Sequence, residues 1–392
     1  MGKRKKWKKI TAMTVVCLLL FGICGCSGGI QNTVDQIEAV LTGNQPLQVE
    51  SVSEGKYAYE TLDDHTKQVY DEIVYTIQNR AEDVQIATTD IEEMEKAYLA
   101  VRYDYCNLFW LDQFTYVIYS RDDEITAIEI NPTYTMTEEE QASVQSKIDE
   151  EAERMLADAP WDGTDYEKAL YVYQTLIEEV DYVEGSENNQ NIISVFLNHE
   201  TICQGYAYAT QYLLEKLGIP CTTVVGTAEG ESHAWNLVIL DGEYYYIDTT
   251  WGNSQYMYRD SENVQEEAVE NKYIDYDYFG ADSRTIMSTH QPDERIPLPE
   301  CTATKDNYYV HEGRYFDEWN PDAIGEVIDT AYENGESLIQ IKFSDMELYE
   351  QALQYFIEEF HLTDYCEELD TVRYMENTDN SVLFLLFPDN ES

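Results

Sequence analysis

The chain has 392 residues, and its 77 Asp and Glu against 24 Lys and Arg give a formal net charge of −53 at neutral pH. A surface this acidic repels phosphate backbones, which excludes nucleic acids as partners. Because 43% of the residues are hydrophobic and 33 are Tyr, the chain can bury a sizeable core, and most of it is expected to fold.

The first 26 residues combine a basic start with a short apolar run. Six of the 24 basic residues lie within residues 3–9, and residues 10–23 carry no charge. This is the pattern of a secretory signal peptide, and the apolar run is shorter than the roughly 20 residues of a membrane span. Gly25-Cys26 after aliphatic residues resembles the lipobox of bacterial lipoproteins. The resemblance implies cleavage before Cys26 and a diacyl lipid on its sulfur, and the alternatives are ordinary secretion or an uncleaved anchor.

Residues 27–50 are rich in small and polar residues and predict a flexible tether. With the lipid, this tether would hold the protein at the bacterial cell surface, on the outer side of the cytoplasmic membrane. The membrane is therefore a predicted partner through the lipid alone.

Residues 51–158 predict an N-terminal α+β module. Apolar residues at helical spacing alternate with strand-like runs that end at Pro132. The predicted helices are 57–80, 91–104 and 137–157, and the predicted strands are 108–111, 114–119 and 125–130.

Residues 159–300 predict the central domain, and residues 301–392 predict a small α/β sandwich, because strands and helices alternate there. Residues 255–320 lack regular periodicity and are expected to wrap the core as irregular structure. The central elements are a helix over 165–180, an exposed loop at 184–191, a short helix at 192–197, a helix that begins near Cys203, and strands over 221–227, 232–240 and 243–250. The C-terminal elements are helices over 323–333 and 346–361 and strands over 338–343, 370–375 and 381–387.

Cys203 is predicted to lie in the first turn of a helix that ends near Gly218. Thr201 is the expected N-cap, and Gly205 is expected to leave the approach to the thiol uncrowded. The unpaired N–H groups of a helix start favour a thiolate.

Asp241-Gly242 predicts a two-residue hairpin turn between two strands. With Leu240 opposite Glu243, His233 and Asp248 become diagonal neighbours on one face of the hairpin. An imidazole and a carboxylate can bridge that separation. A helix start laid across this face would bring the Cys203 thiol to the ring.

This set of residues suits thiol catalysis. Cys203 would be the nucleophile, His233 the base that accepts its proton, and Asp248 the carboxylate that orients the ring. The resulting thioester could pass its acyl group to water or to an amine.

Three motifs carry a resemblance to the transglutaminase-like core, a branch of the papain-like thiol enzymes. They are Cys203-Gln204-Gly205-Tyr206-Ala207, His233-Ala234-Trp235-Asn236 and Tyr246-Ile247-Asp248-Thr249-Thr250-Trp251, in the order of the family. The resemblance covers about residues 165–255. It implies an α+β fold in which a helix bearing Cys packs on an antiparallel sheet bearing His and Asp. It also implies an oxyanion donor upstream of Cys203, for which Gln190 is a candidate, with the backbone N–H of Cys203 as the default.

The remaining reactive residues are given structural roles. Five Cys in the body without a short repeated spacing do not make a disulfide framework or a zinc site, and no cofactor or metal is expected. The run Asp275-Tyr276-Asp277 could hold calcium, as in some relatives, but a solvated acidic loop is the preferred interpretation. The other His residues show no partner pattern and are expected at the surface: His65, His199, His290, His311 and His361.

The preferred function is hydrolysis of an amide in a protein or peptide substrate by a surface-anchored thiol enzyme. Cross-linking by transfer to a Lys amine is the second form of the same chemistry. The alternative from another class is a non-catalytic surface binding lipoprotein that uses this core as a scaffold. The sequence leaves the oligomeric state open.

Overall fold

The computed structural model describes residues 49–253, 273–366, 369, 372–378 and 380–387. The predicted signal peptide, Cys26 and nearly all of the tether lie outside these residues. The chain divides into two compact units that interleave along the sequence. The first unit holds the residues up to Asp158 with 183–236 and 291–298, and the second holds 159–182, 237–290 and the residues from Pro299 onward. Each of these two units combines segments from more than one of the three predicted domains. The boundaries of those domains stay a prediction.

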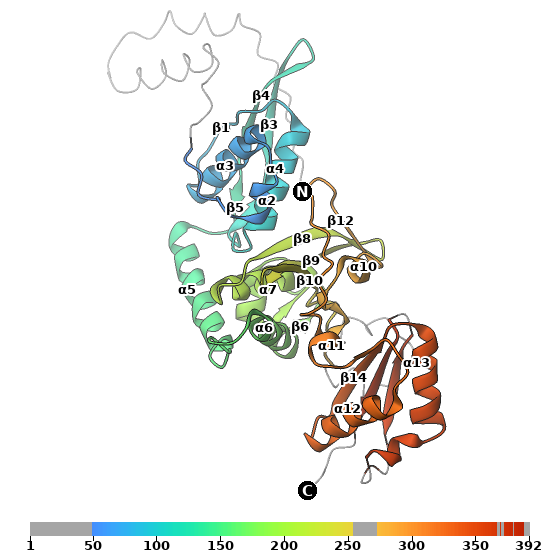
Figure 1. Cartoon of the computed structure of the whole chain (residues 1–392). Helices are drawn as coiled ribbons and strands as arrows, with labels where there is room; N and C mark the ends of the chain where they lie inside the picture. The colour runs from blue at the N-terminus through green and yellow to red at the C-terminus, as the bar shows by residue number, and fades with distance from the viewer. Residues whose placement is uncertain (1–48, 254–272, 367–368, 370–371, 379, 388–392) are drawn as a thin grey trace, which may run out of the picture. The chain divides into compact units, whose positions relative to one another are not determined.

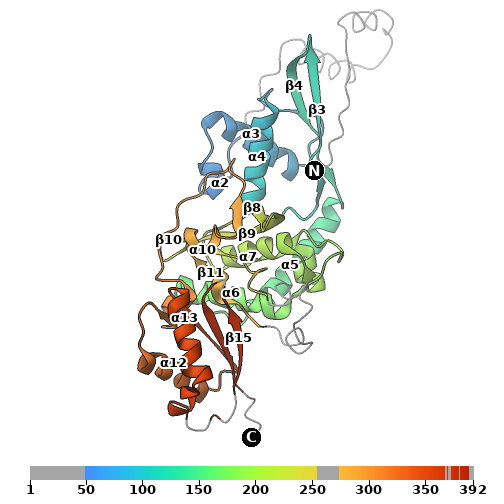
Figure 2. The ribbon, with the colours of Figure 1, turned by 90° about the vertical axis from the view of Figure 1, so that its right-hand side faces the viewer.

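The first unit begins with three helices: α2 Tyr57–Glu60, α3 Asp64–Gln78 and α4 Ile91–Asp104. The α3 and α4 helices lie side by side in both ribbon views (Figures 1 and 2). The prediction of one helix over 57–80 is wrong, because Asp63 interrupts it. The Asp63 carboxylate accepts hydrogen bonds from the His65 and Thr66 N–H groups and so starts a new helix.

The first unit also contains a three-stranded sheet in the order β1-β4-β3. The β3–β4 pair is a long antiparallel hairpin, in which Tyr116 pairs with Ile130 and Arg121 with Glu124 (Figure 2). The strands predicted over 114–119 and 125–130 are confirmed with shifted ends, whereas the strand predicted over 108–111 is wrong, because residues 108–110 form a turn and a strand begins only at Leu111. The elements of this part are β1 Val84–Gln85, β2 Leu111–Gln113, β3 Tyr116–Arg121, β4 Glu124–Ile130, β5 Thr133–Tyr134 and α5 Glu138–Met155, which Thr137 caps.

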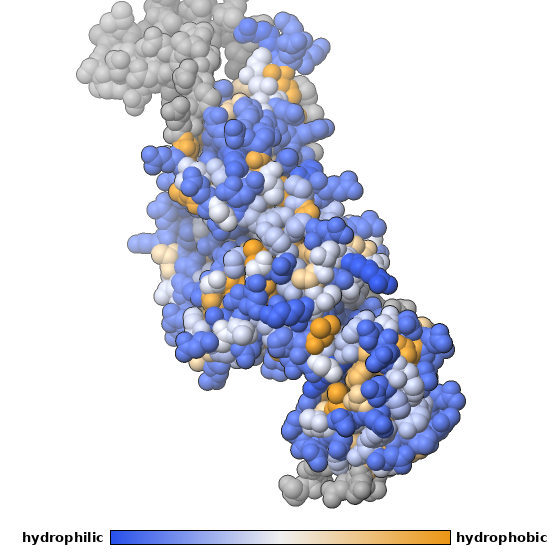
Figure 3. Space-filling view, viewed as in Figure 1, coloured by the Kyte–Doolittle hydropathy of each residue, from blue (hydrophilic) through white to orange (hydrophobic). Residues whose placement is uncertain are grey.

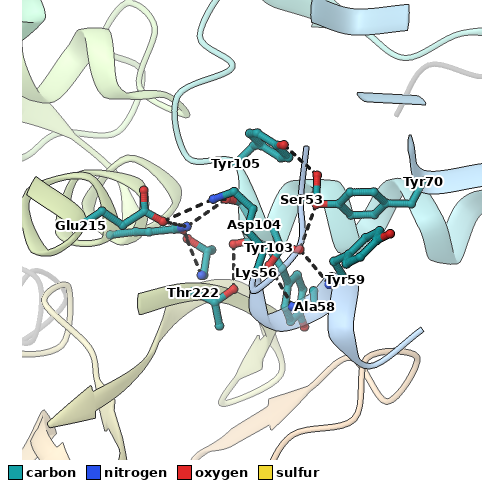
Figure 4. A network of polar contacts seen from close by, with 12 residues as sticks. Ser53, Lys56, Ala58, Tyr59, Tyr70, Tyr103, Asp104, Tyr105, Glu215 and Thr222 are labelled. Atoms are coloured by element: carbon teal, nitrogen blue, oxygen red, sulfur yellow. Dashed lines mark hydrogen bonds and ion pairs between the residues drawn. The ribbon is translucent and has the colours of Figure 1, made fainter. Parts of the chain in front are cut away.

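The last residues of α4 join these helices to one another and to the rest of the first unit (Figure 4). Asp104 is 2% exposed, and its two oxygens accept hydrogen bonds from Ala58 N at 2.9 Å and Tyr59 N at 2.8 Å. The backbone oxygen of Asp104 accepts from Gln211 Nε2, while Thr222 Oγ1 donates to the neighbouring Tyr103 carbonyl. These contacts fix the N-terminal helices to α7 and β8.

The rest of the first unit contains the helix that bears Cys203. The predicted short helix, the Cys203 helix and the following strands are confirmed. They are η1 Ser194–Asn198, β7 Glu200–Thr201, α7 Cys203–Lys216, β8 Cys221–Ala228 and the first part of β9 Glu231–Leu240. Gly218 follows α7 with a φ of 81°, a backbone conformation that suits Gly at a helix C-terminus.

The central sheet has five strands in the order β11-β10-β9-β8-β12. The division between the two units falls inside β9, after Asn236. The elements of the second unit around this sheet are α6 Asp165–Glu179, β6 Asp181–Tyr182, β10 Glu243–Ile247, η2 Tyr276–Tyr278, β11 Phe279–Ala281, α10 Ser283–Ile286 and the start of β12 His290–Pro292. The mixture of helix and antiparallel sheet agrees with the predicted α+β class.

The C-terminal region of the second unit is a four-stranded sheet, β13-β14-β16-β15, covered by helices. The β13–β14 pair is parallel, and the other two pairs are antiparallel. Alternate residues of β14 and β16, such as Ile339, Ile341, Leu383 and Leu385, share one core with the helices, so the predicted α/β layers are confirmed. The elements are α11 Tyr308–His311, β13 Tyr315–Phe316, α12 Pro321–Glu333, β14 Leu338–Phe343, α13 Met346–Ala352, η3 Leu353–Glu358, η4 His361–Asp364, β15 Arg373–Asn377 and β16 Val382–Leu386.

Hydrophilic side chains cover most of the face seen in Figure 3, and hydrophobic ones gather there only in small groups. Among the helices of the described residues, none combines the length and the apolar character that crossing a membrane requires.

Candidate active site

Cys203 is the first residue of α7 and is partly exposed. The residue before it, Ile202, is the N-cap and offers no side-chain hydrogen bond to the helix. The prediction that Thr201 caps the helix is wrong, because its hydroxyl lies 2.8 Å from Ser194 Oγ and 3.0 Å from the Asn189 carbonyl. The first turn of α7 therefore begins at Cys203 without a side-chain cap.

Gly205 allows a close packing beside the thiol. A Cβ at this position would lie 1.9 Å from Thr201 Oγ1 and 3.2 Å from the Asn189 carbonyl oxygen. The missing side chain lets the segment before α7 pack directly on the helix. The expectation that Gly205 leaves the approach to the thiol uncrowded stays a prediction.

His233 lies on β9 and is 3% exposed. Its ring is nearly parallel to that of Trp235, with a centroid separation of 6.0 Å and an angle of 19°. Farther along β9, Asn236 Nδ2 donates to the Ala207 carbonyl at 2.9 Å. Ala207 lies one turn beyond Cys203, so this bond fixes β9 to the part of α7 that follows the thiol.

Asp248 directly follows β10, which ends at Ile247 rather than at the predicted residue 250. The side chain is fully buried, and its Oδ1 accepts hydrogen bonds from Thr250 N at 2.9 Å and Trp251 N at 3.1 Å. The Asp248 N–H donates to the Tyr278 carbonyl at 2.9 Å. The chain therefore turns tightly here and holds one carboxylate oxygen in place.

The turn that precedes β10 is the predicted one. Asp241 and Gly242 have φ values of 48° and 88°, as the mirror-image turns of two-residue hairpins require. Such a turn sets Leu240 opposite Glu243, which is the register used in the sequence prediction.

His290, which was expected at the surface, is buried and bound to Asp248. Its side chain has no exposed area, and its Nε2 lies 2.9 Å from Asp248 Oδ2. No pattern in the sequence predicts this contact, because His290 lies in a stretch without periodicity, 42 positions after Asp248.

The structure places the predicted site residues in both units. Cys203, His233 and the exposed Gln190 belong to the first unit, and Asp248 belongs to the second together with His290. The roles of Cys203, His233, Asp248 and Gln190 stay predictions, as does lipidation of Cys26, which lies outside the described residues.

The other described thiols lie in settings that disfavour a thiolate. Burial raises the pKa of Cys106 and Cys221 well above the ordinary value, and raises those of Cys301 and Cys366 to about 11 and about 12. Desolvation of the charged form is the main cause in each case.

The run Asp275-Tyr276-Asp277 is not the solvated acidic loop that was expected. Asp275 and Asp277 are buried, and the Asp277 carboxylate contacts Lys342 Nζ and accepts from Asn377 Nδ2. Burial and the charge of Asp277 raise the pKa of Asp275. Since an ammonium group already compensates Asp277, these contacts act as a link between η2 and the C-terminal sheet.

Comparison with known proteins finds a family match over the part of the chain that carries Cys203, His233 and Asp248. Residues 154–249 match the model of the transglutaminase-like superfamily. The kyphoscoliosis peptidases of Mus musculus and Homo sapiens are each 22% identical over 223 residues, which cover 52% of this chain and 32% of those proteins. The chain thus spans about a third of the length of the curated relatives it matches. A solved TGase structure is 16% identical over 40% of this chain and 56% of its own, with a TM-score of 0.27.

Residues 154–249 are therefore similar to the core of the transglutaminase-like superfamily, and this segment has the mixed helix and sheet of an α+β fold. The three motifs all lie in or directly beside the matched segment. Members of this superfamily are generally cysteine-dependent enzymes.

Proposed function

We propose that the protein is a thiol hydrolase that cleaves an amide bond of a protein or peptide through a thioester on Cys203. The observation that carries the proposal is Cys203 itself, a partly exposed thiol at the uncapped start of α7 within a transglutaminase-like core. The matched relatives are named as peptidases, which favours hydrolysis over cross-linking.

His233 acts as the general base and Asp248 orients it. The thiol gives its proton to His233, and Sγ attacks the amide carbonyl carbon. The C–N bond then breaks, and His233 returns the proton to the leaving amine. Water next attacks the thioester carbonyl carbon and gives a proton to His233. The C–S bond breaks, the acid is released, and the Cys203 thiolate takes the proton back from His233.

Two features of the described residues support these roles. The β9–β10 hairpin carries His233 on one strand and Asp248 just beyond the other, with the turn that the predicted register requires. The burial of Asp248 and its bonds to Thr250 N and Trp251 N keep a carboxylate in one orientation.

The test is a product assay on the purified protein. We expect it to cleave members of a peptide library, and Cys203→Ala to abolish cleavage, because the thioester cannot form. The matched control is Cys221→Ala, which removes a thiol whose pKa burial raises and should retain activity. A primary amine is added in a parallel reaction, and products are identified by mass spectrometry.

The outcomes separate the alternatives. Products that carry the added amine would favour a transglutaminase. Cleavage that persists in Cys203→Ala contradicts the thiol mechanism. Binding of peptides without any product, equal in wild type and Cys203→Ala, would favour the non-catalytic binding protein.

A further inference from the structure

Both oxygens of the Asp248 carboxylate are engaged within the second unit. The two backbone N–H groups described above bind Oδ1, and His290 Nε2 lies 2.9 Å from Oδ2. Neither side chain of this pair exposes more than 1% of its area. A buried ionised carboxylate needs donors on both oxygens, and His290 supplies one of them.

The His290 ring is held in place on several sides. Its Nδ1 lies 2.8 Å from Thr289 Oγ1, and its ring packs on Trp251 at a centroid distance of 4.8 Å and on Tyr278 at 6.0 Å. Trp251 belongs to the same turn whose N–H binds Asp248. The ring and the carboxylate are thus fixed by one common set of neighbours.

The donor in this contact can be assigned from chemistry. An ionised carboxylate has no proton to give, so His290 Nε2 carries the hydrogen and donates it to Oδ2. Thr289 Oγ1 can then serve Nδ1 either as donor or as acceptor. The assignment holds for the neutral and the charged ring alike.

We propose that His290 is a positioning residue of the thiol site, which holds Asp248 ionised and correctly oriented so that Asp248 can support His233. The inference rests on the proposed function, since it assigns a role within the same site. His290 acts through Asp248 and does not itself exchange a proton with the substrate.

The surroundings of Asp248 make this donor important. Burial and the charges of Asp248, Asp275 and Asp277 raise the pKa of Tyr173 and Tyr278. Hydrogen bonds to the charged form favour it, and desolvation opposes it. Removal of the His290 donor therefore shifts Asp248 toward its neutral form, which supports an imidazolium poorly.

The test uses two replacements of similar length, His290→Gln and His290→Met, in the full-length protein. The Gln side chain keeps an N–H donor, and the Met side chain removes it. We expect His290→Met to lower kcat by about 10- to 100-fold with little change in KM, which is the loss that removal of a residue orienting a metal ligand typically causes. His290→Gln should recover most of the loss, and His361→Leu, at an exposed His of the C-terminal region, should leave the activity unchanged.

A second readout does not depend on turnover. The carboxyl carbon of Asp248 is followed by ¹³C NMR over pH, with Asp248→Asn to assign its signal. We expect His290→Met to shift the titration of Asp248 to higher pH, and His290→Gln to shift it less. This measurement tests the effect of His290 on Asp248 even if the Cys203→Ala variant shows that the proposed function is wrong.

Three results would overturn the inference. The first is an equal loss of activity in the folded Gln and Met variants, and the second is an unchanged Asp248 titration in both. The third is a complete loss in His290→Gln, as deep as in His233→Ala, which would make His290 the base. If His290→Met does not fold, His290→Gln decides alone: retained activity with an ionised Asp248 supports the inference, and a folded inactive protein contradicts it.

Discussion

Cys203 differs from the other described thiols in its position at a helix start. Burial raises the pKa of the thiols of Cys106, Cys221, Cys301 and Cys366, which suppresses their reactive thiolate form near neutral pH. We therefore expect iodoacetamide to label Cys203 first, as measured by peptide mapping of the native protein at pH 7.

The same experiment tests the two partner residues. His233→Ala should slow the labelling of Cys203, because the thiolate loses its ion-pair partner. Asp248→Asn should slow it less, since an amide can still hold the ring. Its effect on kcat should also be smaller than the roughly 10⁴-fold loss that the corresponding change causes in a serine protease. Labelling of Cys203 no faster than that of the buried thiols would count against the proposed site.

At the scale of elements, Asp104 connects α2 to α4 and makes the stability of the folded protein depend on pH. The short helix α2 has no side-chain cap of its own, and the Asp104 carboxylate at the end of α4 accepts its Ala58 and Tyr59 N–H groups instead. Burial raises the pKa of Asp104 to about 6, although these bonds and the Tyr70 hydroxyl oppose the shift.

The direction of the effect follows from that pKa. In the unfolded chain the carboxyl loses its proton near pH 4, and in the folded protein only near pH 6. The stabilisation that the raised pKa of Asp104 gives the folded protein is therefore complete below pH 4 and is lost as the pH rises through 6. From pH 5 to pH 7.5 the free energy of unfolding should fall by about 1 kcal/mol through this group alone.

Urea unfolding of the wild type and Asp104→Asn at the two pH values measures this contribution. Asp104→Asn cannot titrate at this position, so the free energy of unfolding of the wild type minus that of the variant should fall by about 1 kcal/mol from pH 5 to pH 7.5. A difference that stays constant with pH, or that grows, contradicts the assignment.

At the scale of the whole molecule, the predicted lipid at Cys26 decides where the protein works. Two acyl chains are enough for stable membrane attachment, whereas an apolar signal peptide is removed on secretion. We expect Cys26→Ala to abolish incorporation of labelled fatty acid and to release the protein from the membrane fraction. Cys24→Ala, two residues away, is the matched control and should remain lipidated. Membrane attachment of Cys26→Ala with an unmodified N-terminus would exclude the lipobox assignment.

The two compact units also belong to this scale. Residues 159–182 and 237–290 group with the C-terminal region, and residues 183–236 group with the N-terminal helices. Sequence composition marks segments along the chain, but it does not tell which segments pack together. The three predicted domains could therefore not anticipate this interleaving.

Much of the local structure could be predicted because its causes are local. Helical spacing of apolar residues marked α4, α6, α7 and α12, and Asp241-Gly242 marked the turn between β9 and β10, where only residues that tolerate positive φ fit. The order and spacing of the Cys203, His233 and Asp248 motifs pointed to the transglutaminase-like core. The break between α2 and α3 was missed because the Asp63 cap competes with an unbroken apolar spacing.

Only the tertiary structure decided which polar groups meet far from one another in sequence. His290 binds Asp248 across 42 residues, and Lys342 meets Asp277 across 65. Thr201 does not cap the helix, because its hydroxyl instead forms hydrogen bonds with Ser194 and Asn189, which the fold brings beside it. A buried polar group needs a hydrogen-bond partner to avoid a desolvation cost. Which partner lies within reach depends on packing in three dimensions rather than on a pattern of neighbouring residues.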